Sequence, residues 1–146
     1  MVEEDSLMYT GNGSGSNAGT RFSTEDESVH CHVVVEQAAC AVVRPHSVWP
    51  ADQRAQRAED QPDTADTLGW SPDFGTPLGG EPKHWKRTGD YPAVGTGATL
   101  SNDHKLSVVT SWENDDEVVC GAHENNVTCV FDAHGFTVGL DTYETW

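Results

Sequence analysis

Four cysteines are the residues of this 146-residue chain whose spacing is most informative about chemistry. Cys31 and Cys40 have eight residues between them, and so do Cys120 and Cys129. A β-hairpin with two three-residue arms and a two-residue tip fills such an interval. It also places the two cysteines opposite each other, close enough for a disulfide. The spacing therefore predicts two hairpins, each closed by its own disulfide.

The segments around the two pairs resemble each other, SVHCHVVVEQAACAVV against EVVCGAHENNVTCVFD. Each has a β-branched residue before the first cysteine, a polar centre, and apolar residues near or after the second. The predicted tips are Val35-Glu36 and Glu124-Asn125, and the second tip has the better turn residues. Two short-range disulfides indicate an oxidising compartment outside the cytosol.

A zinc site is the competing interpretation, because His30 and His32 flank Cys31, and His123 lies near Cys120. A tight C-x-x-C motif is absent from the sequence. In a strand, His30 and His32 also point to the face opposite Cys31, so one tetrahedral site does not easily take all three. Free buried thiols are a further alternative. We predict disulfides, with no metal and no cofactor.

His134 is the best single candidate for catalysis because histidine titrates near neutral pH, and Asp132 precedes it by two residues. The sequence has no G-x-S-x-G elbow around a serine nucleophile, and no glycine-rich nucleotide motif. The structural interpretation, in which His134 hydrogen-bonds a backbone carbonyl and fixes the strand before Phe136, is therefore preferred. A small secreted hydrolase that uses His134 stays as an alternative.

Aromatic and basic side chains recur through residues 68–97, a segment rich in proline and glycine. The rings could cap the edge of the core or form a groove for a sugar or a peptide. The basic residues could pair with the acidic surface or contact an anion. The candidate binding residues are Trp70, Phe74, Trp85, Tyr91, Lys83, Lys86 and Arg87.

The composition narrows the classes of partner. Net charge is −16, from 24 acidic and 8 basic residues, so the surface repels phosphate backbones and anionic lipid. No stretch approaches the ~20 apolar residues of a membrane span. We therefore expect neither nucleic-acid binding nor membrane insertion. We also expect the protein to be a monomer.

Residues 1–20 lack the basic and apolar regions of a secretory signal, and we interpret them as a flexible lead-in or linker.

The elements that must carry these residues are mostly strands. Alternation predicts a strand and hairpin over 22–43, with 38–43 as a central strand. Residues 44–67 are expected to form a short surface helix or a loop, and 68–97 to be irregular. Further strands are predicted at 99–112, 118–123, 126–131 and 134–140.

A family resemblance covers about a third of the chain, at the two ends of the domain. The opening FSTEDESVHCHVVVEQAAC, the loop YPAVGTGATL and the close CGAHENNVTCVFDAHGFTVGLDTY resemble small secreted actinobacterial cell-envelope domains of unknown function. The chain departs from that pattern at Ala133, at Glu25-Asp26-Glu27, and in having no further cysteines in its middle. The resemblance implies export and a cell-envelope location, and it implies no activity.

Together these observations predict a mainly β fold. We expect a small antiparallel β-sandwich or curled sheet over residues 21–146, with two disulfide-closed hairpins and a long irregular middle segment. The expected function is that of an exported, non-catalytic domain that binds an envelope or extracellular protein or glycan. An acidic inhibitor or interaction protein for a basic partner is a third possibility.

Overall fold

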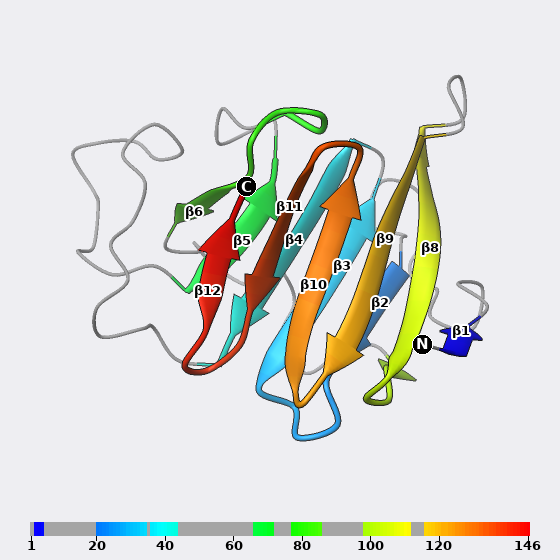
Figure 1. Cartoon of the computed structure of the whole chain (residues 1–146), viewed down its shortest axis with the longest axis vertical. Coiled ribbons are helices and arrows are strands. Elements are labelled where there is room, and N and C mark those ends of the chain that lie inside the picture. The colour runs from blue at the N-terminus through cyan, green and yellow to red at the C-terminus, as the bar shows by residue number, and fades with distance from the viewer. Residues whose placement is uncertain are drawn as a thin grey trace.

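The computed structural model describes residues 2–4, 20–34, 36–43, 66–71, 77–85, 98–111 and 116–146. In these ranges the chain forms twelve strands and no helix, and the strands belong to two six-stranded sheets. The sheets lie face to face as the two layers of a sandwich (Figure 1). The predicted mainly β fold is confirmed.

We name the sheets A and B. Sheet A has the strand order β1 (Val2–Glu4), β8 (His104–Ser111), β9 (Asp116–His123), β10 (Asn126–Phe131), β11 (His134–Val138), β12 (Tyr143–Thr145). Sheet B has the order β6 (Lys83–Trp85), β5 (Thr67–Trp70), β4 (Gln37–Val42), β3 (Val29–Val34), β2 (Thr20–Ser23), β7 (Ala98–Thr99). All neighbours pair antiparallel except β1 with β8 and β2 with β7, which make both sheets mixed.

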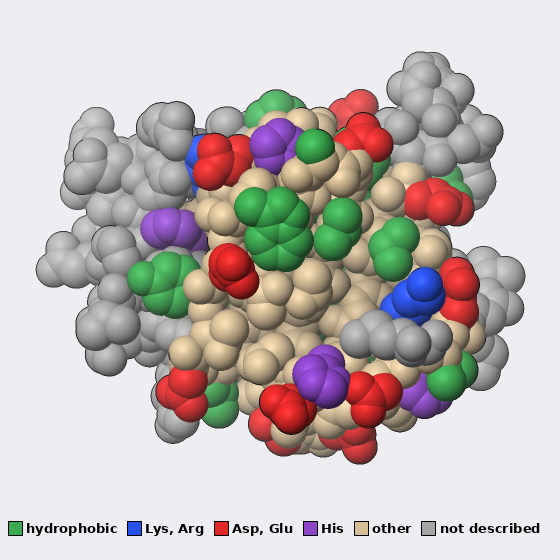
Figure 2. All heavy atoms as spheres, viewed as in Figure 1, with side chains coloured by type: hydrophobic (Ala, Val, Ile, Leu, Met, Phe, Trp, Pro, Cys, Tyr) green, Lys and Arg blue, Asp and Glu red, His purple; other side chains and the backbone are tan. Residues whose placement is uncertain are grey.

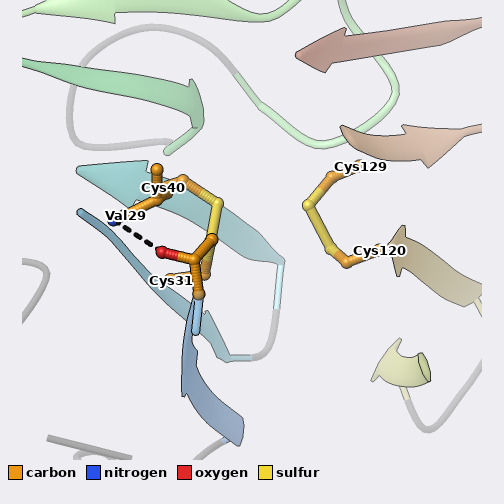
Figure 3. Close-up of a disulfide and its surroundings, with 6 residues drawn as sticks. Val29, Cys31, Cys40, Cys120 and Cys129 are labelled. Atoms are coloured by element: carbon orange, nitrogen blue, oxygen red, sulfur yellow. Dashed lines mark hydrogen bonds between the residues drawn. A yellow bond between two sulfur atoms is a disulfide. The ribbon is translucent and has the colours of Figure 1, made fainter. Parts of the chain in front are cut away.

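Each predicted hairpin forms, one in each sheet, and its cysteines occupy directly opposed positions. Cys31 pairs with Cys40 in sheet B and Cys120 with Cys129 in sheet A, and both pairs are disulfide-bonded. The Cα atoms of the two pairs are 4.0 and 4.1 Å apart, the close approach of a non-hydrogen-bonded antiparallel pair. The two disulfides project from the two sheets into the space between them (Figure 3).

The hairpin tips also lie where the spacing placed them. Val34 pairs with Gln37, which leaves residues 35–36 as the first tip. The second tip is Glu124-Asn125, and both of its residues have positive φ (50° and 62°), as a type I′ turn requires. The favourable turn residue at this tip is therefore Asn125, while Glu124 takes up a left-handed conformation that costs a non-glycine residue energy.

The core fills the space between the sheets. Its inward-facing side chains include both disulfides, and the largest of the fully buried ones are Trp70, Phe22, Phe136, Leu68, Leu100 and Leu106. Alternation along β3 behaves as predicted, because Val29, Cys31 and Val33 belong to this core. His30 and His32, on the opposite face of β3, are also buried, at 4% and 6% exposure.

Five short strands were not predicted. β5 and β6 lie in the stretch expected to be irregular, and β1 lies in the expected lead-in. β5 packs very close to β4: a Cβ at Gly69 would lie 2.1 Å from the carbonyl oxygen of Ala38. Gly69 also has a φ of +149°, which side chains rarely adopt. β7 and β12 are likewise too short, at two and three residues, to show a period-2 pattern.

Contacts between the layers tie the sheets at their margins. The amide of Glu36, at the β3–β4 tip, donates a 2.9 Å hydrogen bond to the carbonyl of Thr110 in β8. At the other side of the sandwich, the rings of His84 in β6 and Tyr143 in β12 meet edge-on with centroids 6.3 Å apart. Sheets A and B thus contact each other both at the β3–β4 tip and at the edge formed by β6 and β12.

Candidate functional site

Trp70 belongs to the core, in line with the interpretation in which these rings cover its edge, so the alternative groove does not include it and it is no longer a candidate binding residue. Its side chain is fully buried, and its ring packs edge-on against Phe136 and Phe131, with centroids 5.4 and 6.4 Å away. The indole nitrogen donates a 2.7 Å hydrogen bond to the carbonyl of Gly80. Trp70 points inward because β5 is a strand of sheet B, so its ring joins the core between the sheets.

The other candidates of the middle segment are only partly placed. Lys83 and Trp85 lie in β6, and the Lys83 ammonium is 3.8 Å from the carboxylate of Glu81. This contact agrees with the interpretation in which the basic residues pair with the acidic surface. Phe74, Tyr91, Lys86 and Arg87 lie outside the described residues.

His134 forms a hydrogen bond with a main-chain oxygen, as the structural interpretation of this residue expects. Its Nδ1 is 3.0 Å from the main-chain oxygen of Trp146, at the start of β11. Asp132 is exposed and occupies the β10–β11 turn with a positive φ of 51°. The two side chains are thus placed on a hairpin end, and no hydrogen bond between them occurs in the described structure.

The cysteines predicted as possible zinc ligands are all committed to disulfides. Among the described residues no group of three or more His, Cys, Asp or Glu side chains is arranged to hold a metal. His30 bonds the carbonyl of Glu27 at 2.9 Å. Burial, together with the nearby Arg21 charge, lowers the pKa of His32 to about 4, so His32 is neutral at physiological pH.

His123 is the titratable side chain whose partner sequence analysis missed. Its Nδ1 lies 2.6 Å from a carboxylate oxygen of Asp103, and this hydrogen bond and charge raise the pKa of His123. Asp103 lies in the turn before β8, twenty residues away in sequence, with a positive φ of 66°. The amide of Asn125, at the β9–β10 tip, donates a 2.8 Å hydrogen bond to the Asn102 side chain of this turn, and no local pattern in the sequence signals that contact.

The outer face of sheet A is the main surface that the described structure leaves open. Residues of two adjacent cross-strand rows face away from the core. One row runs through Gly135, Val130, Val119 and Ser107. The next row runs through Glu144, Thr137, Thr128, Gly121 and Lys105. Apart from Glu144 and Lys105 at the two ends of the second row, these side chains are small or short, so the middle of this face is flat (Figure 2).

Trp146 extends the first of these two rows beyond β11. The main chains of Gly135 and Trp146 exchange hydrogen bonds of 3.1 and 3.0 Å, and the Trp146 ring lies over Gly135, where a Cβ would come within 2.6 Å of it. The side chain is nonetheless 42% exposed. Val130 and Val119 continue this row, and the 39%-exposed Val109 of β8 lies diagonally beside Val119, opposite Glu117. We call these four side chains the apolar row.

Acidic side chains surround the apolar row. Residues 116–146, which make up β9 to β12, contain no lysine or arginine. Lys105 is the one Lys or Arg in the described strands of sheet A. Figure 2 shows red side chains around the margin of this face and green ones gathered in its upper middle. The exposed acidic residues of sheet A and its turns, which we call the acidic margin, are Glu3, Asp103, Glu117, Glu124, Asp132, Asp141 and Glu144.

A pocket of about 250 Å³ lies where the acidic margin meets sheet B. It is lined by Asp26, Ser28, Glu124, Asn125, Asn126, Leu140, Asp141 and Thr142. One carboxylate oxygen of Asp26 accepts hydrogen bonds from the Ser28 hydroxyl and amide and from the Thr24 hydroxyl, at 2.6, 3.0 and 2.9 Å. Burial opposes ionisation of Asp26, but these bonds outweigh it and lower its pKa.

The outer face of sheet B differs from that of sheet A. Its central strands carry Ser23, His30, His32, Ala39 and Ala41 on that side, and all of them are buried. Among the described residues, those in the centre of sheet B are therefore buried on both faces, whereas the outward-facing side chains of sheet A are half-buried or exposed. No helix in the described part of the chain is long and apolar enough to cross a membrane. Comparison of the chain with protein-family models, curated proteins and solved structures gives no match.

Proposed function

We propose that this chain is an extracytoplasmic, non-catalytic domain that binds an envelope or extracellular protein or glycan. The observation that carries the proposal is the open outer face of sheet A. It combines a flat centre, an exposed tryptophan and a row of valines. Exposed apolar side chains arranged on one flat face are typical of a binding surface, and tryptophan is among the residues that contribute most at such surfaces.

Two buried disulfides support the location outside the cytosol, because such bonds persist in oxidising compartments. The resemblance of the closing segment to small secreted cell-envelope domains agrees with this location. The bond between His134 and the Trp146 oxygen supports a structural role for the best catalytic candidate.

Binding to isolated cell envelopes tests the proposal. The oxidised chain, labelled with a fluorophore, is titrated onto envelopes of the cells that produce it, and onto envelopes treated with protease or with periodate. Saturable binding that one treatment abolishes supports the proposal, and the treatment identifies the partner as protein or glycan. Absence of saturable binding, or release of a product from envelope polymers by the chain, contradicts it.

A further inference from the structure

We infer that the outer face of sheet A docks a protein whose contact surface has an apolar centre surrounded by lysine and arginine. The inference rests on the proposed function and deepens it, because it names the class of partner and the surface that receives it. Three features of this face carry it: the apolar row, the flatness of the centre, and the acidic margin.

The apolar row supplies the centre of the contact. Two hydrogen bonds to Gly135 hold the main chain of Trp146, and its ring packs over Gly135, so the ring loses less freedom on binding than an unsupported side chain would. Val130 and Val119 stand beside it on neighbouring strands in directly paired positions. A rigid aromatic ring next to short branched side chains presents apolar area that an apolar partner surface can cover without rearrangement.

The second cross-strand row keeps the face flat. Thr128 and Thr137 hydrogen-bond each other through their hydroxyls at 2.8 Å, so these polar groups already have a partner when water is removed. Gly121 adds no side chain next to them. This arrangement lowers the cost of covering the row, because a buried hydroxyl without a partner is expensive.

The acidic margin selects the charge of the partner. Glu117 and Glu144 are exposed at opposite sides of the face, and Lys105 is the one fixed positive charge in the described strands around it. Complementary charges at the rim raise the association rate and exclude partners of the same sign. A second copy of this chain has the same sign, with a net charge of −16, so self-association is disfavoured. A basic protein gains from every one of these rim charges.

The pocket at the margin adds a place for one basic side chain. Its lining includes the carboxylates of Asp26, Glu124 and Asp141. The hydrogen bonds to Asp26 hold this carboxylate in its charged form. A lysine or arginine at the edge of the docked protein would therefore reach an oxygen-rich recess in which its charge is compensated.

Site-specific photo-crosslinking tests the inference. One form of the full oxidised chain carries benzoyl-phenylalanine in place of Val109, on the docking face, and a matched control form carries it in place of Val43. These two valines have similar exposure, 39% and 44%, but Val43 follows β4 in sheet B. Both forms are irradiated with the envelope and secreted fractions of the producing cells, and the crosslinked peptides are mapped by mass spectrometry.

The crosslinked protein is then purified, and its dissociation constant for the chain is measured against salt and against charge variants. We expect a crosslink from position 109 and none from position 43, to a partner peptide flanked by Lys or Arg. We expect the affinity to fall about tenfold or more between ~0.05 and ~0.5 M NaCl. Glu117→Lys and Glu144→Lys should weaken binding, Lys105→Glu should strengthen it, and Val43→Lys should change it little.

The other outcomes overturn the inference in distinguishable ways. A crosslink from position 43 alone, a partner whose affinity ignores salt and the charge variants, or envelope binding destroyed only by periodate leaves the proposed function standing and removes this docking face. A crosslinked dimer of the chain identifies the face as a self-association surface. No crosslink from either position, together with no saturable envelope binding, removes both the inference and the proposed function.

Discussion

The ring of Trp146 lies over Gly135, and the two residues exchange a pair of main-chain hydrogen bonds of 3.1 and 3.0 Å. A side chain at position 135 has no room, because its Cβ would lie 2.6 Å from the Trp146 ring and 2.8 Å from the carbonyl oxygen of Cys129. Glycine weakens a strand because it has no side chain to pack. Here the Trp146 ring covers Gly135 and supplies the packing that the glycine lacks.

This relationship predicts that Gly135→Ala destabilises the fold by about 1–3 kcal/mol, the usual cost of overpacking. Urea unfolding followed by far-ultraviolet circular dichroism measures the loss. In a Trp146→Ala background the same substitution should cost less, because one of the two close contacts is gone. An equal cost in both backgrounds would show that the ring does not exclude the side chain.

The two disulfides occupy equivalent positions and close loops of equal length, with a sequence separation of 9 in each. We therefore expect removal of either one, as Cys31→Ala with Cys40→Ala or as Cys120→Ala with Cys129→Ala, to cost a similar amount, about 2–3 kcal/mol by loop entropy. Denaturant unfolding of the two double variants provides the comparison. A difference of several kcal/mol between them would mean that packing of the removed sulfurs, and not loop closure, dominates.

His32 predicts a contribution to pH-dependent stability. Its pKa is lowered from about 6.5 to about 4 in the fold, by burial and then by the Arg21 charge, so the unfolded chain binds more protons at His32 than the native one between these values. Stability should therefore be fully present above about pH 6.5 and fall as the pH drops toward 4, by up to about 3 kcal/mol from this residue.

The variant His32→Leu isolates this effect, because the carboxylates that titrate in the same range are unchanged. The difference in unfolding free energy between the variant and the parent chain should change with pH between about 4 and 6.5, with the parent losing relative stability toward acid. If this free-energy difference is constant between pH 4 and 6.5, the pKa of His32 is not lowered by folding. Titration of its ring by NMR gives the same quantity directly.

The net charge of −16 predicts that added salt stabilises the domain. Screening shortens the range of charge repulsion from about 30 Å at 0.01 M to about 3 Å at 1 M, and so reduces repulsion within the acidic margin. The thermal midpoint should rise between these concentrations of NaCl. In the triple variant Glu117→Gln, Asp132→Asn, Glu144→Gln the rise should be smaller. Sucrose, which is excluded from protein surfaces but screens nothing, serves as the control for a non-electrostatic effect.

The features that sequence analysis predicted well are those set by near neighbours. An interval of eight residues determines the register of Cys31 with Cys40, and alternation along β3 determines which side chains face the core. The position of Trp70 could not be predicted in this way. Its inward direction depends on pairing of β5 with β4, more than twenty residues earlier, and on the close approach that Gly69 permits. The open face of sheet A was missed for a different reason: β12 has only three residues, too few for a period-2 pattern to indicate that Trp146 continues the row of Val130 and Val119.

Each disulfide joins two neighbouring strands of one hairpin, and neither joins sheet A to sheet B. The correct partner of every cysteine is therefore also its nearest cysteine along the chain, and a loop of about ten residues closes within ~10–100 ns in an unfolded peptide. Oxidation of the nascent chain can reach the native pairing hairpin by hairpin, before the sandwich exists, with little need for an isomerase to correct wrong pairs.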